Sequence, residues 1–259
     1  MASVAPSLPL FYNGLEPLSS ETHREWRLRP RESAPFLLGQ HAIPLTVEEF
    51  PLAQRNFPIV FSEGDDSVPL ALLGLNEGVN TFAGEDGRFY ENVYVPAYVR
   101  RYPFMLARLT PDAEQLSLCF DPTSDAVGPF DEGERLFDAD GQPAQTTKEI
   151  LGFNELFEQA GQRTAAFMAD LRELGLLMEG ETTITEEGAE QPFVYRGFQI
   201  VNEEKLAALR GDQLRKASQS GLLPMVYAHL FSLSLMRDIF ARQKGQGKMP
   251  LPTLPPFTA

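Results

Sequence analysis

The chain has 259 residues, with 36 acidic side chains against 22 lysines and arginines, and its formal net charge is -14. A strongly negative potential repels polyanions, so we expect no nucleic-acid partner. A chain of this length buries roughly 70 to 75% of its unfolded surface, enough for one large domain or two modest ones. No apolar run approaches the roughly 18 residues of a membrane span, and the N-terminus lacks a basic start followed by an apolar stretch. We therefore expect a cytoplasmic protein that does not span a membrane.

The first 35 residues are rich in proline and carry no clear hydrophobic period, which predicts an extended N-terminal arm, residues 1–35. Residues 22–31 within it hold four arginines, a local exception to the acidic background. The single cysteine, Cys119, lies in an apolar run and is predicted to be a small buried side chain.

Short apolar runs bounded by turn residues predict an antiparallel sheet in the N-terminal half of the chain. They cover residues 57–61, 68–75, 104–109 and 116–120. Thr46 and Glu49 have the spacing of a capping box and predict one short helix, which Pro51 limits. The Asp-Gly pairs ending at Gly87 and Gly141 predict tight turns.

Helical spacing begins after Thr146, where apolar residues recur three and four apart as far as Met178. Gly175 is expected to end this helix. A hairpin (182–185 with 193–195) and a last strand (198–201) follow, and then a short helix with Asn202 as its N-cap and a final helix (222–242). The fold class is α+β: mainly antiparallel sheet in the N-terminal half, packed with two long C-terminal helices. We expect a single domain at 36–242 and a flexible tail rich in proline and glycine at 243–259.

The sequence contains no P-loop, no Gly-x-Gly-x-x-Gly fingerprint, no Gly-x-Ser-x-Gly elbow and no cysteine cluster for zinc. We therefore predict no catalytic residues and no cofactor, and favour a protein that is not an enzyme. One alternative is a non-haem iron site made of His23, Glu25 and His229, which has the composition of two histidines and one carboxylate. A surface histidine and an ion-paired glutamate is the preferred interpretation of the first two residues, because His-x-Glu arises easily by chance. His229, on the apolar face of the final helix, is most simply a core histidine.

Two adjacent arginines, Arg100 and Arg101, lie among aromatic residues and prolines. Together with Tyr98, Tyr102 and His229 they are the candidate ligand-binding residues, since guanidinium groups grip carboxylates and phosphates and aromatic rings provide stacking walls. The competing interpretation places them in a strand-turn-strand corner as ion-paired scaffold residues. We prefer the scaffold, and expect only one of the two arginines to enter any pocket, because adjacent strand residues face opposite sides.

The stretch from Tyr94 to Phe104, Tyr-Val-Pro-Ala-Tyr-Val-Arg-Arg-Tyr-Pro-Phe, resembles the central signature of the bacterial SapC family. Residues 57–61 and 69–75 precede it as in the family, and residues 10–18, with His23 and the segment 221–230, are similar to the family's ends. The resemblance spans about residues 8 to 240. It implies a role in surface-layer (S-layer) transport or secretion and supplies no catalytic residues.

We accordingly expect a soluble accessory or interaction protein of a cell-surface transport or secretion pathway, which binds a peptide or protein client. Formation of a homo-oligomer stays open. The alternative is a small-ligand-binding protein or non-haem iron enzyme that uses an arginine-lined anion pocket.

Overall fold

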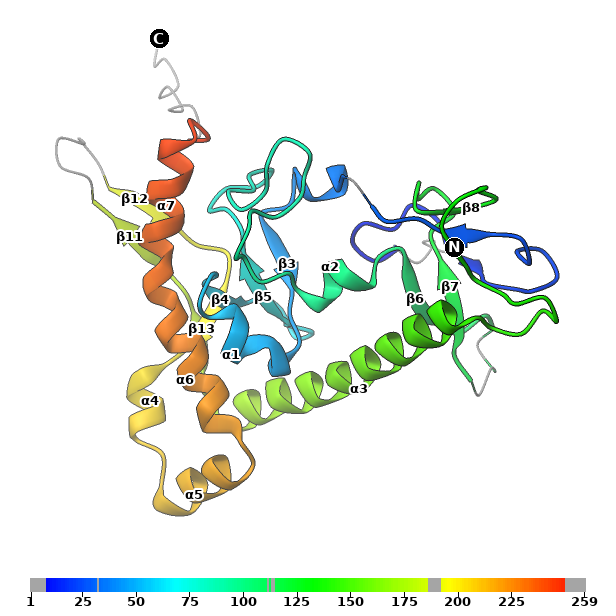
Figure 1. Cartoon of the computed structure of the whole chain (residues 1–259). Helices are drawn as coiled ribbons and strands as arrows, with labels where there is room; N and C mark the ends of the chain where they lie inside the picture. Colours follow the sequence, from blue (N-terminus) through cyan, green and yellow to red (C-terminus); the bar gives the residue numbers. More distant parts are fainter. Residues whose placement is uncertain (1–7, 32, 111, 113–114, 186–191, 250–259) are drawn as a thin grey trace, which may run out of the picture. The chain divides into compact units, whose positions relative to one another are not determined.

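The computed structural model describes residues 8–31, 33–110, 112, 115–185 and 192–249 (Figure 1). They divide into two compact units. Unit 1 combines the residues up to Ala34 with Val95–Thr164, and unit 2 combines Pro35–Tyr94 with the residues from Ala165 onwards. The boundaries proposed from sequence, a single domain at 36–242 between an arm and a tail, stay a prediction, and the tail beyond Met249 lies outside the described residues.

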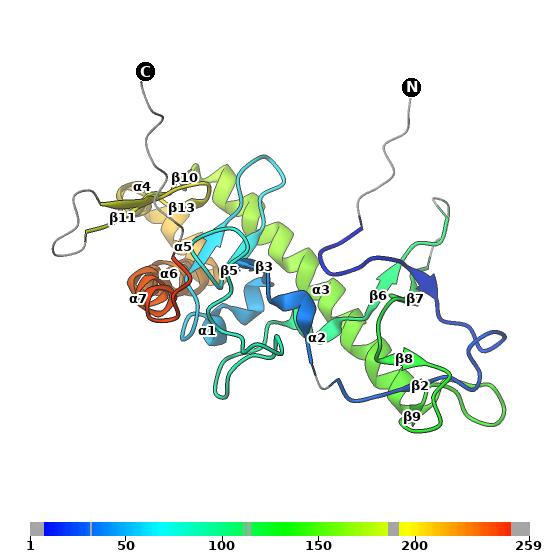
Figure 2. The same cartoon turned by 90° about the horizontal axis from the view of Figure 1, so that it is seen from above.

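Two small antiparallel sheets build unit 1. One sheet has the strand order β1-β7-β6. The other has the order β8-β2-β9, and its three strands lie side by side in Figure 2. Their bounds are β1 Glu16–Pro17, β2 Arg27–Leu28, β6 Phe104–Ala107, β7 Ser117–Phe120, β8 Val127–Gly128 and β9 Glu134–Arg135. The predicted N-terminal arm thus supplies one strand to each sheet. Cys119 on β7 is buried, as predicted.

Apolar side chains from both sheets form the core of unit 1. Phe104, Phe120 and Val127 are buried together with Leu136, and Trp26 packs against them. Aromatic residues favour such half-buried pleated surfaces, and Phe104 and Phe120 lie in the two longer strands, β6 and β7. The strands hold residues 16–17 and 27–28 against residues about a hundred positions later in the chain.

Unit 2 is built on a five-stranded antiparallel sheet with the order β10-β13-β4-β5-β3 and a separate hairpin of β11 and β12. The bounds are β3 Ala42–Pro44, β4 Ile59–Phe61, β5 Pro69–Leu72, β10 Leu177–Glu179, β11 Thr182–Ile184, β12 Phe193–Tyr195 and β13 Gln199–Val201. All three residues of β4 are buried. The central strand is therefore covered on both faces, and α6 (Leu222–Ser232) contacts it.

Helices and sheets together confirm the predicted α+β class. The long helix α3 spans Gln145–Glu173, starting in unit 1 and ending in unit 2. It ends before Gly175, whose φ of 64° is left-handed, so the predicted stop is confirmed. Met178 lies beyond it in β10.

The predicted final helix is divided in two. A 3-10 turn (Leu233–Leu235) separates α6 from α7 (Met236–Gly245), and the three pieces follow almost one line in Figure 1. Shorter helices are α1 Phe50–Ala53, α2 Ala97–Arg101, α4 Glu203–Ala207 and α5 Gly211–Gln219. Asn202 caps α4 by accepting a hydrogen bond from the amide of Lys205 at 2.9 Å, as predicted. The predicted capping box is also present, since Glu49 accepts from the Thr46 amide at 2.8 Å.

Candidate functional site

Unit 1 contains a pocket of about 490 Å³. Four arginines from two distant parts of the chain line it: Arg29 and Arg31 follow strand β2, and Arg100 and Arg101 end helix α2. The remaining lining residues are Leu28, Val99, Tyr102, Pro103, Phe104, Ala126, Glu149, Ile150, Phe153 and Asn154. The pocket therefore combines positive charge with an apolar wall.

The segment that carries Arg100 and Arg101 is a short helix, and the predicted strand-turn-strand corner is wrong. Pro96 occupies the N-cap of α2, a position where the missing amide hydrogen costs nothing, and α2 ends before Tyr102. Neighbouring residues on a helix are turned by about 100°, whereas those on a strand are turned by about 180°. Both arginines therefore line one pocket, with Arg100 exposed and Arg101 buried, and the expectation that only one of them enters a pocket is also wrong.

Arg101 is only 7% exposed and lies among aromatic rings. Its guanidinium carbon is 4.3 Å from the ring centroid of Tyr98 and 4.3 Å from that of Phe157. Its nearest carboxylate, Glu158, is 3.9 Å away, and its Nε makes no hydrogen bond within the described residues. A buried donor without an acceptor costs about 1–3 kcal/mol, which offsets part of the stability that packing on the two rings provides. Arg101 is a positive charge fixed in place by this packing.

Arg29 and Arg100 are held by aromatic rings as well, but are exposed. The guanidinium carbon of Arg29 is 3.6 Å from the ring centroid of Phe130, and that of Arg100 is 5.1 Å from the ring centroid of Phe153. Neither arginine has a carboxylate partner in the described part of the chain. Among the residues that the structure describes, Glu149 is the one acidic side chain that lines the pocket. Two guanidinium groups are thus available to an anion.

Tyr102 links the two arginine pairs. Arg31 donates to the Tyr102 carbonyl oxygen at 3.3 Å and lies 4.7 Å above its ring. The Tyr102 hydroxyl donates to Asp121 at 3.2 Å. Burial, followed by the negative charge of Asp121, raises the pKa of Tyr102 to about 12, and burial also raises the pKa of Tyr98. Both phenols stay neutral at physiological pH, so they add no negative charge beside the arginines.

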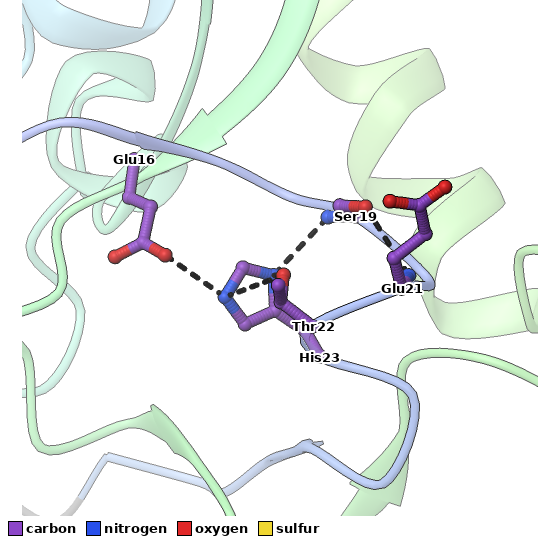
Figure 3. A network of polar contacts seen from close by, with 5 residues as sticks. All are labelled: Glu16, Ser19, Glu21, Thr22 and His23. Carbon is purple, nitrogen blue, oxygen red and sulfur yellow. Dashed lines mark hydrogen bonds and ion pairs between the residues drawn. The ribbon is translucent and has the colours of Figure 1, made fainter.

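His23 is a buried structural residue, shown in Figure 3. Its Nδ1 accepts a hydrogen bond from the Ser19 amide at 3.1 Å, and its Nε2 therefore donates to Glu16, also at 3.1 Å (Figure 3). Glu25 instead pairs with Arg135 at 3.3 Å. With both ring nitrogens engaged, this arrangement leaves His23 no lone pair for a metal ion.

His229 belongs to unit 2 and is not among the residues that line the arginine pocket. Its Nε2 accepts from the Val201 amide at 3.1 Å, so Nδ1 donates to the Ile59 carbonyl at 2.7 Å. The imidazole thereby bridges β13 and β4. Burial lowers its pKa from 6.5 to about 4. Among the described residues, no group of three histidine, cysteine, aspartate or glutamate side chains could hold a metal ion.

Sequence reasoning missed Arg29 and Arg31 as members of the pocket. The available signal was the cluster of arginines in residues 22–31 of an otherwise acidic chain. Tyr98, which was predicted to contact a ligand, packs against the guanidinium group of Arg101 and is not among the residues that line the pocket.

No described helix is both long enough and apolar enough to cross a membrane. No curated protein and no solved structure matches the chain. The model of the SapC family matches residues 18–239, which include every residue that lines the arginine pocket. By this match over most of its length, the chain belongs to the SapC family.

Proposed function

We propose that the protein is a client-binding accessory protein of a bacterial cell-surface transport or secretion pathway. Its client is a peptide or protein that presents an anionic group to the arginine pocket of unit 1. Family membership supports the pathway, and the pocket supports the binding role.

The observation that carries this proposal is that Arg29 and Arg100 have no carboxylate partner among the described residues. A protein with a net charge of -14 has carboxylates in excess, and surface arginines pair with them readily. These two instead lie on aromatic rings that line or adjoin one pocket, with no carboxylate partner among the described residues. An anionic group on another molecule would accept charge-assisted hydrogen bonds from both guanidinium groups.

The test is affinity capture of the full chain from its own cells under mild conditions. Wild type is compared with the double substitution Arg29→Glu and Arg100→Glu, which reverses the charge of both exposed pocket arginines. The matched control is Arg55→Glu with Arg237→Glu, two exposed arginines of unit 2 that make the same change in net charge.

The proposal predicts that a specific export or cell-surface protein is retained by wild type and by the control and is lost from the pocket variant. Equal retention by all three proteins would show that the pocket does not hold the client. Capture of no such protein in several growth states would contradict the accessory role itself.

A second candidate function is the binding of a small organic anion. The volume of about 490 Å³ favours it, because small-molecule sites span about 300–1,000 Å³. Mass spectrometry of the protein purified from its own cells under native conditions tests it. A bound small acid that is absent from the double pocket variant would support this candidate.

A further inference from the structure

The apolar part of the pocket wall narrows the chemistry of the ligand. Seven lining residues are apolar: Leu28, Val99, Pro103, Phe104, Ala126, Ile150 and Phe153. We infer that the pocket takes a carboxylate carried on an apolar group, an inference that deepens the client-binding function proposed above and rests on it.

Arg29 and Arg100 are assigned as the groups that contact the carboxylate. A guanidinium presents a planar pair of N–H donors that matches the two oxygens of a carboxylate. Stacking on Phe130 and Phe153 orders these two side chains before a ligand arrives, which reduces the entropy lost on binding. Arg101, buried beside them, adds positive charge that cannot move away.

A phosphate group fits this wall less well than a carboxylate does. Removal of a strongly hydrated dianion from water costs more than removal of a monoanion, and much of the pocket lining is apolar. Glu149 lines the same pocket and repels a second negative charge. Polyphosphates and nucleic acids also face the long-range repulsion of a chain with a net charge of -14.

The apolar wall calls for a ligand in which the carboxylate is attached to hydrocarbon. Each methylene group that leaves water for this wall strengthens binding by about fourfold. Two sources share this chemistry: the C-terminal carboxylate of a peptide or protein with an apolar last residue, and a free organic acid. The peptide terminus agrees with a protein client, and a free acid agrees with the second candidate function.

The experiment is isothermal titration of the full chain with four probes. They are N-acetyl-Ala-Ala-Phe with a free carboxylate, the same peptide as its C-terminal amide, 3-phenylpropionate, and inorganic phosphate. The inference predicts that at least one carboxylate probe binds, that the amide binds at least about tenfold more weakly than the peptide acid if the terminus is the source, and that phosphate does not compete.

Variants identify the site of binding. Arg29→Gln and Arg100→Gln are each expected to weaken the carboxylate probe about tenfold or more, because each removes a charge-assisted contact. Arg55→Gln is the matched control and should bind as wild type does. Both pocket arginines are exposed, so the variants are expected to fold, and far-UV circular dichroism checks this.

The outcomes separate this inference from the proposed function. Binding of 3-phenylpropionate without the peptide acid supports the carboxylate inference and contradicts a peptide terminus as the source. Equal binding of acid and amide, competition by phosphate at the same concentration, or no carboxylate binding at millimolar concentration overturns the inference. In the last case, client capture that still depends on Arg29 and Arg100 would leave the accessory function standing.

Discussion

His229 should set much of the stability of unit 2 and its dependence on pH. Its imidazole is fully buried and joins two strands of the sheet, accepting from the Val201 amide and donating to the Ile59 carbonyl. The substitution His229→Leu removes the imidazole that pairs with both groups, and leaves the buried Val201 amide and the buried Ile59 carbonyl without a partner. At about 1–3 kcal/mol for each group, the free energy of unfolding should fall by about 2–6 kcal/mol.

The pH dependence follows from the lowered pKa. In the unfolded chain the imidazole takes up a proton as the pH falls through 6.5, whereas in the folded chain it stays neutral down to about 4. The free energy of unfolding therefore decreases between these two values and not below them, by about 3 kcal/mol in total. His229→Gln keeps a donor and an acceptor without a titrating group, so the variant should lose this part of the pH dependence.

Urea unfolding of wild type and both variants, followed by far-UV circular dichroism at about pH 7.5 and about pH 5, measures both effects. Contributions from carboxylates are common to the three proteins and cancel in the comparison. Amide hydrogen exchange at Val201 reports on the same strand directly. Two results would refute the reasoning: a His229→Leu protein within about 0.5 kcal/mol of wild type, or a His229→Gln protein with the pH dependence of wild type.

Two further predictions use pairs of neighbouring or similar positions. Arg101→Ala should destabilise unit 1 by about 2–4 kcal/mol, because it removes a buried side chain that packs on aromatic rings. Arg100→Ala should cost no more than about 1 kcal/mol, because it removes one exposed contact with the ring of Phe153. Urea unfolding compares the two variants, and equal effects would contradict the assigned roles. Gly74→Ala should destabilise unit 2 by roughly 2–4 kcal/mol, since a Cβ would lie 2.0 Å from the carbonyl oxygen of Val79, whereas at Gly39 nothing lies within 4 Å. Thermal unfolding of Gly74→Ala and Gly39→Ala tests this, and similar melting temperatures would count against the close approach.

Local signals in the sequence predicted several elements because each rests on residues near one another in the chain. The end of α3 at Gly175, the cap at Asn202 and the hairpin of β11 and β12 are of this kind. Residues 186–191, between the two strands of the hairpin, lie outside the described part of the chain.

Helix α2 was mistaken for a strand corner for a physical reason. Five residues are too few to show a helical period, and the aromatic and β-branched residues around Arg100 favour strands in isolation. Tertiary burial of Ala97, Tyr98 and Val99 decides the conformation instead. Propensity is a weak guide where packing of this kind outweighs it.

Only two of the four arginines that line the pocket could be predicted from the sequence. The sequence indicated Arg100 and Arg101 as candidate ligand-binding residues, but gave no reason to place them beside the arginines of the first 35 residues. Arg31 and Tyr102, which are in contact, are 71 positions apart. A single sequence carries no signal for such a pairing, because it depends on the antiparallel strands that bring both segments into unit 1.

The most direct test of the account is a thermodynamic cycle between the carboxylate of a ligand and the exposed arginines of the pocket. The affinities of the peptide acid and of its amide are measured for wild type and for the protein with Arg29→Gln and Arg100→Gln together. If these arginines hold the carboxylate, the preference for the acid, about tenfold or more in wild type, disappears in the double variant. A preference of the same size in both proteins would contradict the account, because the carboxylate would then be recognised elsewhere.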